Sequence, residues 1–422
     1  MQLPYLTADL PGIGGFLKTQ FEDFAVDEVP LYEASGTGTH AYIQIQKRGY
    51  STMEAARLIA KAIGRKSFDI GYAGLKDTRA VTTQWFSVEH EYNARFEGLA
   101  LPPGLKILKV SRHKNKIKLG HLAGNKFIIK VRNPEWQRVG TPMDQIVARA
   151  VAVLERLEKS GVPNFFGPQR FGMRKDNHLL GLALLREDYE TFIKHFLGNP
   201  DEDVDRGDIL SARKAFMAGE FENALNRWPG HLRNERVALN AVVRGKGAPS
   251  AYKRAVHAID HRLKDLLISA LQSWLFNQVL ERRLPKFTAI LPGDLCEKHE
   301  NGAVFVVGDE PDAAMKEQAR ADAHEISPTG PLFGHRMSEA GSVVKLMEES
   351  VLKANGLSLD NFAGRNGARG TRRALRFFVR DMAIGHGEDE HGPFIEVRFT
   401  LPSGSYATVL LGEVMKTELA LD

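Results

Sequence analysis

The sequence predicts an α+β protein in which a mixed, mostly antiparallel sheet is interrupted by a largely helical insertion. Residues 1–160 alternate between strand-like and helical patterns, and helical patterns dominate from 161 to about 285. Strand patterns return near residue 376. Because β-rich sequence lies on both sides of a helical middle, we expect both ends of the chain to share one sheet. The predicted domains are 1–160 together with 376–422, and 161–375.

Length and composition agree with two domains. At 422 residues the chain exceeds the size at which a single core stops growing, and its 43% hydrophobic and 26% charged residues are typical of a soluble globular protein. The net charge of +5 permits a polyanionic partner. The single cysteine, Cys296, excludes a disulfide framework and a thiolate metal cluster. With neither a signal-peptide pattern nor an apolar run of roughly 20 residues, we expect a cytoplasmic protein without a membrane segment.

The first 160 residues justify the sheet. Residues 42–47 alternate between apolar and polar, as in a half-buried strand, and 84–88 predict a return strand. Between them, Ser51 and Glu54 form a capping box for a helix that ends at Gly64. Further predicted elements are a β-rich unit at 105–132 with the basic run 112–118 on a hairpin, and a helix from Thr141-Pro142, with the proline at its first position, to about Lys159.

The remaining elements follow the same reasoning. The longest helical pattern runs from Tyr252 to Leu284, and residues 286–375 are predicted to be loop-rich. Strands are expected at 377–384 and 394–400, and a helix after Ser405.

Asp77 is the first candidate for chemistry. It lies between Lys76 and Arg79, just after a break at Gly74. Nearby positive charge favours the ionised carboxylate. An ordinary charged surface turn explains the same residues, so composition alone leaves both interpretations open.

Other motifs point away from common enzyme classes. His386 and His391 lie between two strand patterns in a glycine-rich stretch typical of a solvated hairpin loop, and their spacing matches no usual zinc pattern. The glycines at 12–15 precede no helix start, and no Gly-x-Ser-x-Gly elbow is present. We expect no metal and no phosphate loop.

Basic and aromatic residues gather in three runs, at 112–118, 169–171 and 365–373. Arginine pairs with phosphates in bidentate geometry, and aromatic rings stack on unpaired bases. Each run alone could be a solvated charged face, but together they favour RNA binding.

Several longer motifs resemble those of the TruD family of tRNA pseudouridine synthases, in the family's order. They are residues 73–77, 124–127, 163–172, 269–277 and 401–408, with 17–24 and 112–116 fitting as well. The resemblance spans about residues 16 to 416. It implies a pseudouridine synthase fold interrupted by a TRUD insertion domain.

The resemblance also implies an activity: isomerisation of uridine to pseudouridine in RNA, with uridine 13 in the D-arm of tRNA as target. It implies no cofactor, an RNA partner and no obligate protein partner. Asp77 is the implied catalytic residue, with Lys18 as its basic partner. An aspartate near the sugar could act as nucleophile, remove a sugar proton or stabilise positive charge at C1′.

Further residues take roles by the same resemblance. Phe127, Asn125 and Tyr406 are implied to contact the target base, with Tyr406 at a position usually held by phenylalanine. Two alternatives stay open: a core position for the Phe127 ring, and a hydrogen bond of Asn125 near Asp77 instead of to uracil. The implied RNA-binding residues are Lys76, Arg79, Arg112, His113, Lys116, Asn164, Gln169 and Arg170.

Two alternatives and one departure accompany this hypothesis. The protein could bind RNA without catalysis, or it could be a methyltransferase, although it lacks a glycine-rich nucleotide turn. Residues 185–257 are predicted to be helical and are additional relative to short bacterial members of the family. RNA targets other than uridine 13 are therefore left open.

Overall fold

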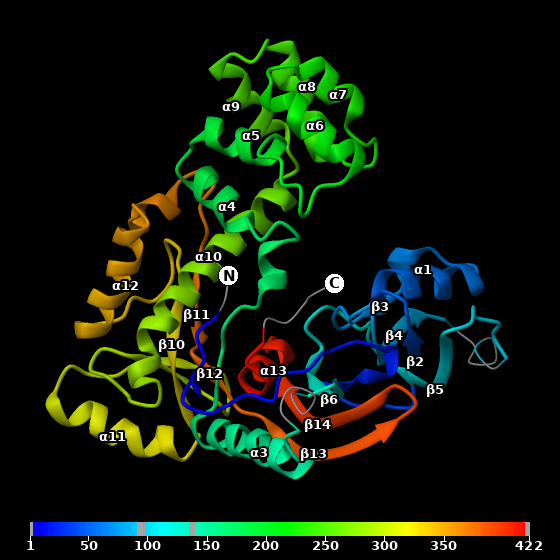
Figure 1. The fold of residues 1–422 in the computed structure, drawn as a ribbon, viewed down its shortest axis with the longest axis vertical. Coiled ribbons are helices and arrows are strands. Elements are labelled where there is room, and N and C mark those ends of the chain that lie inside the picture. The colour runs from blue at the N-terminus through cyan, green and yellow to red at the C-terminus, as the bar shows by residue number, and fades with distance from the viewer. Residues whose placement is uncertain (1–2, 91–95, 97, 135–139, 418–422) are drawn as a thin grey trace. The chain divides into compact units, whose positions relative to one another are not determined.

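The computed structural model describes residues 3–90, 96, 98–134 and 140–417. The chain divides into two compact units, each with its own packing (Figure 1). One unit contains residues 2–164 and 376–420, so it is built from both ends of the chain. The other is the continuous segment 165–375.

Among the described residues, eight strands form one sheet in the first unit. Seven of them follow the order β13-β14-β6-β1-β4-β2-β5, and β3 pairs with β4. Strands β1 and β4 run parallel, while β1 and β6 and the pairs β6–β14 and β2–β4 are antiparallel. The bounds are β1 Phe24–Pro30, β2 His40–Arg48, β3 Gly71–Tyr72, β4 Val81–Glu89, β5 Leu105–His113, β6 Leu122–Arg132, β13 Arg380–Asp389 and β14 Gly392–Pro402.

The prediction of a hairpin within residues 105–132 is wrong. Strand β5 pairs with β2 at the edge of the sheet, whereas β6 pairs with β1 and β14 in its interior. The basic run therefore connects two distant strands. A true hairpin is formed by β13 and β14, with His386 paired inside β13 opposite Ile395 instead of in a loop. The turn is consequently tighter than predicted.

Among the described residues, three α-helices complete this unit. In α1 (Thr52–Ala62), Ser51 Oγ accepts from the backbone N–H of Glu54 as predicted, and Gly64 has a φ of 68° just beyond the helix. Helix α3 (Met143–Ser160) begins one residue later than expected, with Pro142 at the N-cap position. Figure 1 shows α3 and the last helix, α13 (Ala407–Met415), beside β13 and β14. A short pairing of β7 (Val162–Pro163) with β12 (Arg376–Phe377) joins the two chain segments.

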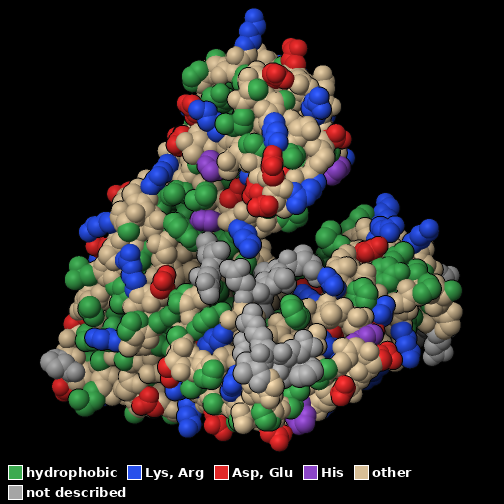
Figure 2. Space-filling view, viewed as in Figure 1, with side chains coloured by type: hydrophobic (Ala, Val, Ile, Leu, Met, Phe, Trp, Pro, Cys, Tyr) green, Lys and Arg blue, Asp and Glu red, His purple; other side chains and the backbone are tan. Residues whose placement is uncertain are grey.

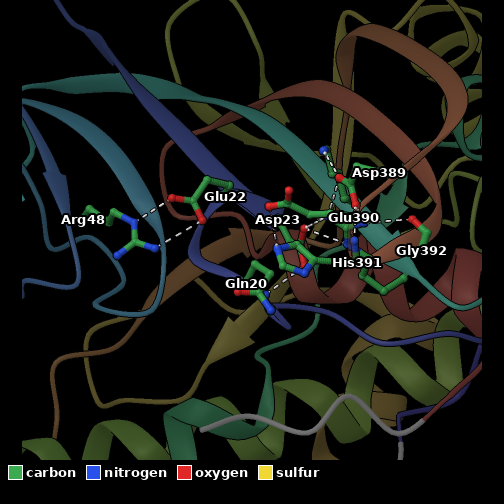
Figure 3. Close-up of polar contacts among 10 residues, drawn as sticks. Gln20, Glu22, Asp23, Arg48, Asp389, Glu390, His391 and Gly392 are labelled. Carbon is green, nitrogen blue, oxygen red and sulfur yellow. Dashed lines mark hydrogen bonds and ion pairs between the residues drawn. The ribbon is translucent and has the colours of Figure 1, made fainter.

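A largely buried ion-pair network ties β6 and β13 to Asp23, in the segment before β1 (Figure 3). Arg132, at the end of β6, donates to Asp23 Oδ1 through both Nε and Nη2, at 2.9 and 2.6 Å. Its guanidinium also bonds Asp389 at the end of β13. Arg132 and Lys130 hold the pKa of Asp389 far below its usual range. The segment before β1 is therefore fixed to the middle of the sheet.

The second unit is helical at first. A core of aromatic and aliphatic side chains, including Phe192, Trp228 and Leu271, lies among these helices. The predicted continuous helix from 252 to 284 is broken at Ile259, because Asp260 caps a new helix by accepting from Arg262 N at 2.8 Å. The helices are α4 Asn177–Leu185, α5 Tyr189–Leu197, α6 Gly207–Met217, α7 Phe221–Arg227, α8 Arg233–Arg244, α9 Pro249–Ala258 and α10 His261–Arg283.

Residues 286–375 are more regular than predicted. Within the described residues they form a four-stranded sheet in the order β11-β10-β8-β9. Helices α10 and α11 pack against β10, and α12 packs against α10. Buried ion pairs support this region: Arg283 with Asp294 at 2.6 Å and Arg372 with Glu348 at 2.7 Å. The elements are β8 Leu295–Lys298, β9 Val304–Val306, α11 Pro311–Asp322, β10 Ile326–Leu332, α12 Ser342–Ala354 and β11 Thr371–Ala374.

No helix among the described residues is long and apolar enough to span a membrane. In the same residues, no three or more His, Cys, Asp or Glu side chains are grouped so that they could hold a metal ion.

Candidate active site

The segment that carries Asp77 is fixed through its backbone. Gln84 Nε2 on β4 donates to the carbonyl of Gly74 at 2.6 Å. Thr52 Oγ1, at the start of α1, accepts from the backbone N–H of Lys76 at 2.9 Å and donates to Gln84 Oε1 at 3.0 Å. Two buried side chains thus anchor the backbone on either side of Leu75.

Lys47 adds a third anchor at Asp77 itself. Its Nζ donates to the carbonyl oxygen of Asp77 at 3.0 Å and to that of Tyr50 at 2.7 Å. The residue is completely buried, and this burial lowers the pKa of Lys47 from 10.5 to about 8, although Asp77 opposes the shift. Lys47 therefore fixes the backbone of Asp77 and adds positive charge beneath it.

Lys18 reaches the carboxylate side of Asp77. Its Nζ lies 3.4 Å from Asp77 Oδ2 and 4.6 Å from the centre of the Phe24 ring. The Lys18 side chain is 13% exposed and that of Asp77 is 43% exposed. The ion pair is therefore open to a ligand mainly on the Asp77 side. Lys18 has a left-handed backbone, with a φ of 55°.

The strand register explains how these residues meet. One row of partners crosses five strands: Lys47, Thr82, Val26, Phe127 and Phe399. Paired residues on neighbouring strands point to the same face. The lysine under Asp77 and the aromatic pair therefore lie on one face of the sheet.

Phe127 belongs to an aromatic cluster. Its ring stacks on Phe399, with centroids 5.1 Å apart and planes at 24°, and it meets Phe24 edge-on at 6.1 Å. Phe127 is 7% exposed. Tyr406, the other predicted base contact, is half-buried immediately before α13, and the ring stacked on Phe127 is that of Phe399.

Asn125 and Glu28 form the next row on the same face. The Oδ1 atom of Asn125 is buried and accepts no hydrogen bond from the described residues. This oxygen can therefore accept a hydrogen bond from a ligand. Glu28 Oε2 lies 2.8 Å from Lys76 Nζ, with both side chains at most 4% exposed. The Lys76 ammonium thus faces Glu28 inside the unit, which argues against its predicted contact with RNA phosphates.

A cavity of about 160 Å³ borders the same segment at Ala73 and Glu28. Tyr32, Tyr42 and Trp85 also line it. The tyrosine hydroxyls are engaged, with Tyr32 bonded to His121 Nδ1 and Tyr42 donating to the carbonyl of Asn115, each at 2.7 Å. The cavity therefore combines aromatic walls with charged side chains, among them Glu28, Glu33 and Lys109.

The basic run 112–118 is used partly for structure. Arg112 donates to the carbonyls of Gly38 and His90, and Lys116 donates to that of Phe68. His113 stacks on Tyr32. These three predicted RNA contacts support loops. The exposed basic side chains of the run are those of Lys114 and Lys118, which the prediction included only as members of the run.

Of the remaining predicted RNA contacts, Arg79 is exposed in the loop after Asp77, and Asn164 is buried. Gln169 is exposed in the second unit, whereas Arg170 bonds Ser269 and Ser273 on α10. Arg372, within the third basic run, is buried against Glu348. On the face shown in Figure 2, lysines and arginines are spread among acidic and apolar side chains over both units.

Sequence reasoning missed Lys47, Thr52, Gln84, Glu28 and Phe399. Each lies within a strand or at a helix start, where the residue type is ordinary. The pairing of β2, β4, β1, β6 and β14 brings the strand residues to the site, and Thr52 reaches it from the start of α1. The sole available signal was a lysine at an inward-facing position of an apolar strand, which is rarely tolerated without a partner.

Comparison with known proteins agrees with this architecture. A family model described as tRNA pseudouridine synthase D (TruD) matches residues 1–414. Two relatives named tRNA pseudouridine synthase D, from Geotalea daltonii and Geobacter sulfurreducens, are each 42% identical to the chain. Both alignments cover 98% of this chain, and they cover 100% and 96% of the respective relative.

A solved structure gives the same result. The crystal structure of a protein from Methanosarcina mazei that carries the TruD name matches with a TM-score of 0.84 and 27% identity, over 99% of both chains. The interrupted mixed sheet is thus that of a pseudouridine synthase. The chain belongs to the TruD family of tRNA pseudouridine synthases.

The predicted α+β fold class and the family resemblance are confirmed. Residues 185–257 were expected to be additional relative to short bacterial family members. They do not distinguish this chain from these two bacterial relatives, since the alignments cover 98% of this chain and nearly the whole length of each relative.

Proposed function

We propose that this protein isomerises uridine 13 in the D-arm of tRNA to pseudouridine, with Asp77 as the catalytic carboxylate. The observation that carries the proposal is the Lys18–Asp77 ion pair on a backbone fixed by Lys47, Thr52 and Gln84. A rigidly held carboxylate, exposed on one side, can meet the sugar of a bound nucleotide in a reproducible geometry.

Each neighbour has a role in this proposal. Lys18 places a positive charge beside the Asp77 carboxylate, and Lys47 fixes the backbone of the same residue. The Asp77 oxygen then attacks C1′, removes a sugar proton or stabilises charge at C1′ while the base is detached and turned. The buried acceptor of Asn125 can receive an N–H of uracil, and the Phe127–Phe399 pair supports the base.

The unit with the eight-stranded sheet is the proposed catalytic domain, and 165–375 the TRUD insertion domain. Exposed cations provide phosphate contacts: Arg79 beside Asp77, and Lys114 and Lys118 beyond β5. Gln169 remains a proposed RNA contact. No cofactor is needed for these steps. Because tRNA is the substrate, we expect the protein to act in the cytoplasm.

The test uses purified protein and unmodified tRNA, with pseudouridine mapped by carbodiimide treatment and primer extension. Wild type should give one stop, at uridine 13, and Asp77→Asn should give none while still binding tRNA. Asp27→Asn is the matched control, since Asp27 is an exposed carboxylate on the opposite face of β1. Equal signals from wild type and Asp77→Asn would refute the catalytic assignment. A stop elsewhere would refute the target.

A further inference from the structure

Two large, exposed apolar side chains lie close in the sequence to the partners of the Lys18–Asp77 pair. Leu75, two residues before Asp77, is 67% exposed, and Phe16, two residues before Lys18, is 64% exposed. Single exposed apolar residues are common on protein surfaces. Here, however, one lies two residues before each partner of the same ion pair.

Both side chains are presented by fixed backbone. Leu75 lies between the two anchors at Gly74 and Lys76. The N–H and carbonyl of Phe16 both bond the backbone of Arg132, at 2.8 and 2.9 Å. Arg132 is itself held by Asp23. Both segments are thus fixed to the sheet through their backbones, and their apolar side chains are exposed there.

The chemistry of the reaction supplies an occupant for this surface. A uridine must leave its stack before an enzyme can reach its C1′ and both of its faces. The neighbouring bases then lose a stacking partner. Proteins that open base steps insert apolar side chains between them, and aromatic rings stack on exposed bases.

We propose that Leu75 and Phe16 contact the RNA bases adjacent to the target uridine, with Leu75 as a wedge in the gap and Phe16 as a stacking surface. This inference rests on the proposed function. It assigns the two residues to holding the nucleotide out of its stack, which is separate from the chemistry performed at Asp77.

The first test compares two substrates under single-turnover conditions. Leu75→Ala and Phe16→Ala should each lower the rate on folded tRNA by roughly tenfold or more, since part of the stacking cost goes uncompensated. On a short single-stranded RNA of the same local sequence the rate should change less than about twofold, because the uridine there is already unstacked. Phe68→Ala is the control: Phe68 is 71% exposed on the same unit but lies outside both segments.

The second test needs no catalysis. In the Asp77→Asn background, tRNA with 2-aminopurine directly 3′ of the target reports local stacking by fluorescence. Binding of the Asp77→Asn protein should change the 2-aminopurine fluorescence. Adding Leu75→Ala should remove most of this change, while the affinity for tRNA measured by filter binding falls less than about threefold. Leu75→Met, which keeps an apolar side chain of similar length, should restore it.

The outcomes separate the two hypotheses. The wedge role of Leu75 would be overturned if Leu75→Ala lowered the rate equally on both substrates, or on neither, and also left the 2-aminopurine signal of the bound tRNA as it is without this change. Absence of pseudouridine with wild type on any RNA would overturn the proposed function instead. In that case the fluorescence experiment still decides whether Leu75 enters the base stack.

Discussion

The ammonium of Lys47 lies 3.0 Å from the backbone carbonyl oxygen of Asp77, inside the sheet-bearing unit. The same ammonium holds Tyr50 at 2.7 Å, so one buried charge connects the end of β2, the approach to α1 and the proposed catalytic residue. The lysine acts on Asp77 through the backbone, which makes it a positioning residue.

Replacing Lys47 by methionine should lower kcat by roughly tenfold to a hundredfold, because small displacements of a catalytic group are costly. Stability should change little. The pKa shift of Lys47 from 10.5 to about 8 corresponds to a burial penalty of roughly 3 kcal/mol, which methionine relieves while giving up two hydrogen bonds. Single-turnover rates and thermal unfolding check both points, with the exposed Lys61→Met on α1 as control. A large fall in Tm together with unchanged kcat would contradict the positioning role.

Lys47 also predicts a pH dependence. Since its pKa is lower in the folded protein, the unfolded chain binds more protons between about pH 8 and 10.5, and this group's contribution to the free energy of unfolding rises with pH there. Activity should do the opposite, because the ammonium that holds Asp77 is lost as the pH rises through about 8. The kcat profile of wild type should show this falling limb, and Lys47→Met should lack it. The same limb in both proteins would assign the titration to another group.

Lys18 should act through charge. Lys18→Met removes the cation 3.4 Å from Asp77, so we expect kcat to fall roughly a hundredfold. Lys18→Arg keeps the charge and should recover part of the activity. Residue 18 has a left-handed backbone, and methionine and arginine are non-glycine residues like the lysine they replace. The two variants should therefore have the same Tm. Equal kcat for the methionine and arginine variants would argue against an electrostatic role.

The Asp23–Arg132 pair should matter for stability. Asp23 is fully buried and accepts from Arg132 and from the backbone of Gln20, so Asp23→Ala leaves part of a buried guanidinium unpaired and should cost roughly 3–5 kcal/mol. Asp389→Ala should cost less, since that side chain is 31% exposed and water can replace it. Urea unfolding of both variants measures the difference. Equal losses of unfolding free energy would indicate that Asp389 stabilises the protein as much as Asp23 does, despite its exposure.

The exposed lysines beyond β5 should control the salt dependence of RNA binding. Lys114→Glu with Lys118→Glu should weaken tRNA binding and reduce the slope of log K against log salt by roughly 1.5, as two phosphate contacts are lost. The matched control, Lys106→Glu, changes another exposed lysine on β5. An unchanged slope would remove this run from the RNA-binding surface.

The fold class and the family can both be predicted from the sequence without a structure. Local patterns are enough for these: alternation marks the strands, Ser51 and Gly64 delimit α1, and long motifs in a fixed order mark the resemblance. It also singled out Lys18 and Asp77 as partners, and the structure brings the two within 3.4 Å.

Tertiary structure decided which ordinary residues serve the site. Lys47, Thr82, Val26, Phe127 and Phe399 share one row only because β2, β4, β1, β6 and β14 pair in a particular register. Register depends on contacts between strands far apart in the chain, and a local pattern does not encode it. The same holds for the cations: their residue types were visible in the sequence, but burial turned Lys76 toward Glu28 and left Lys114 and Lys118 to solvent.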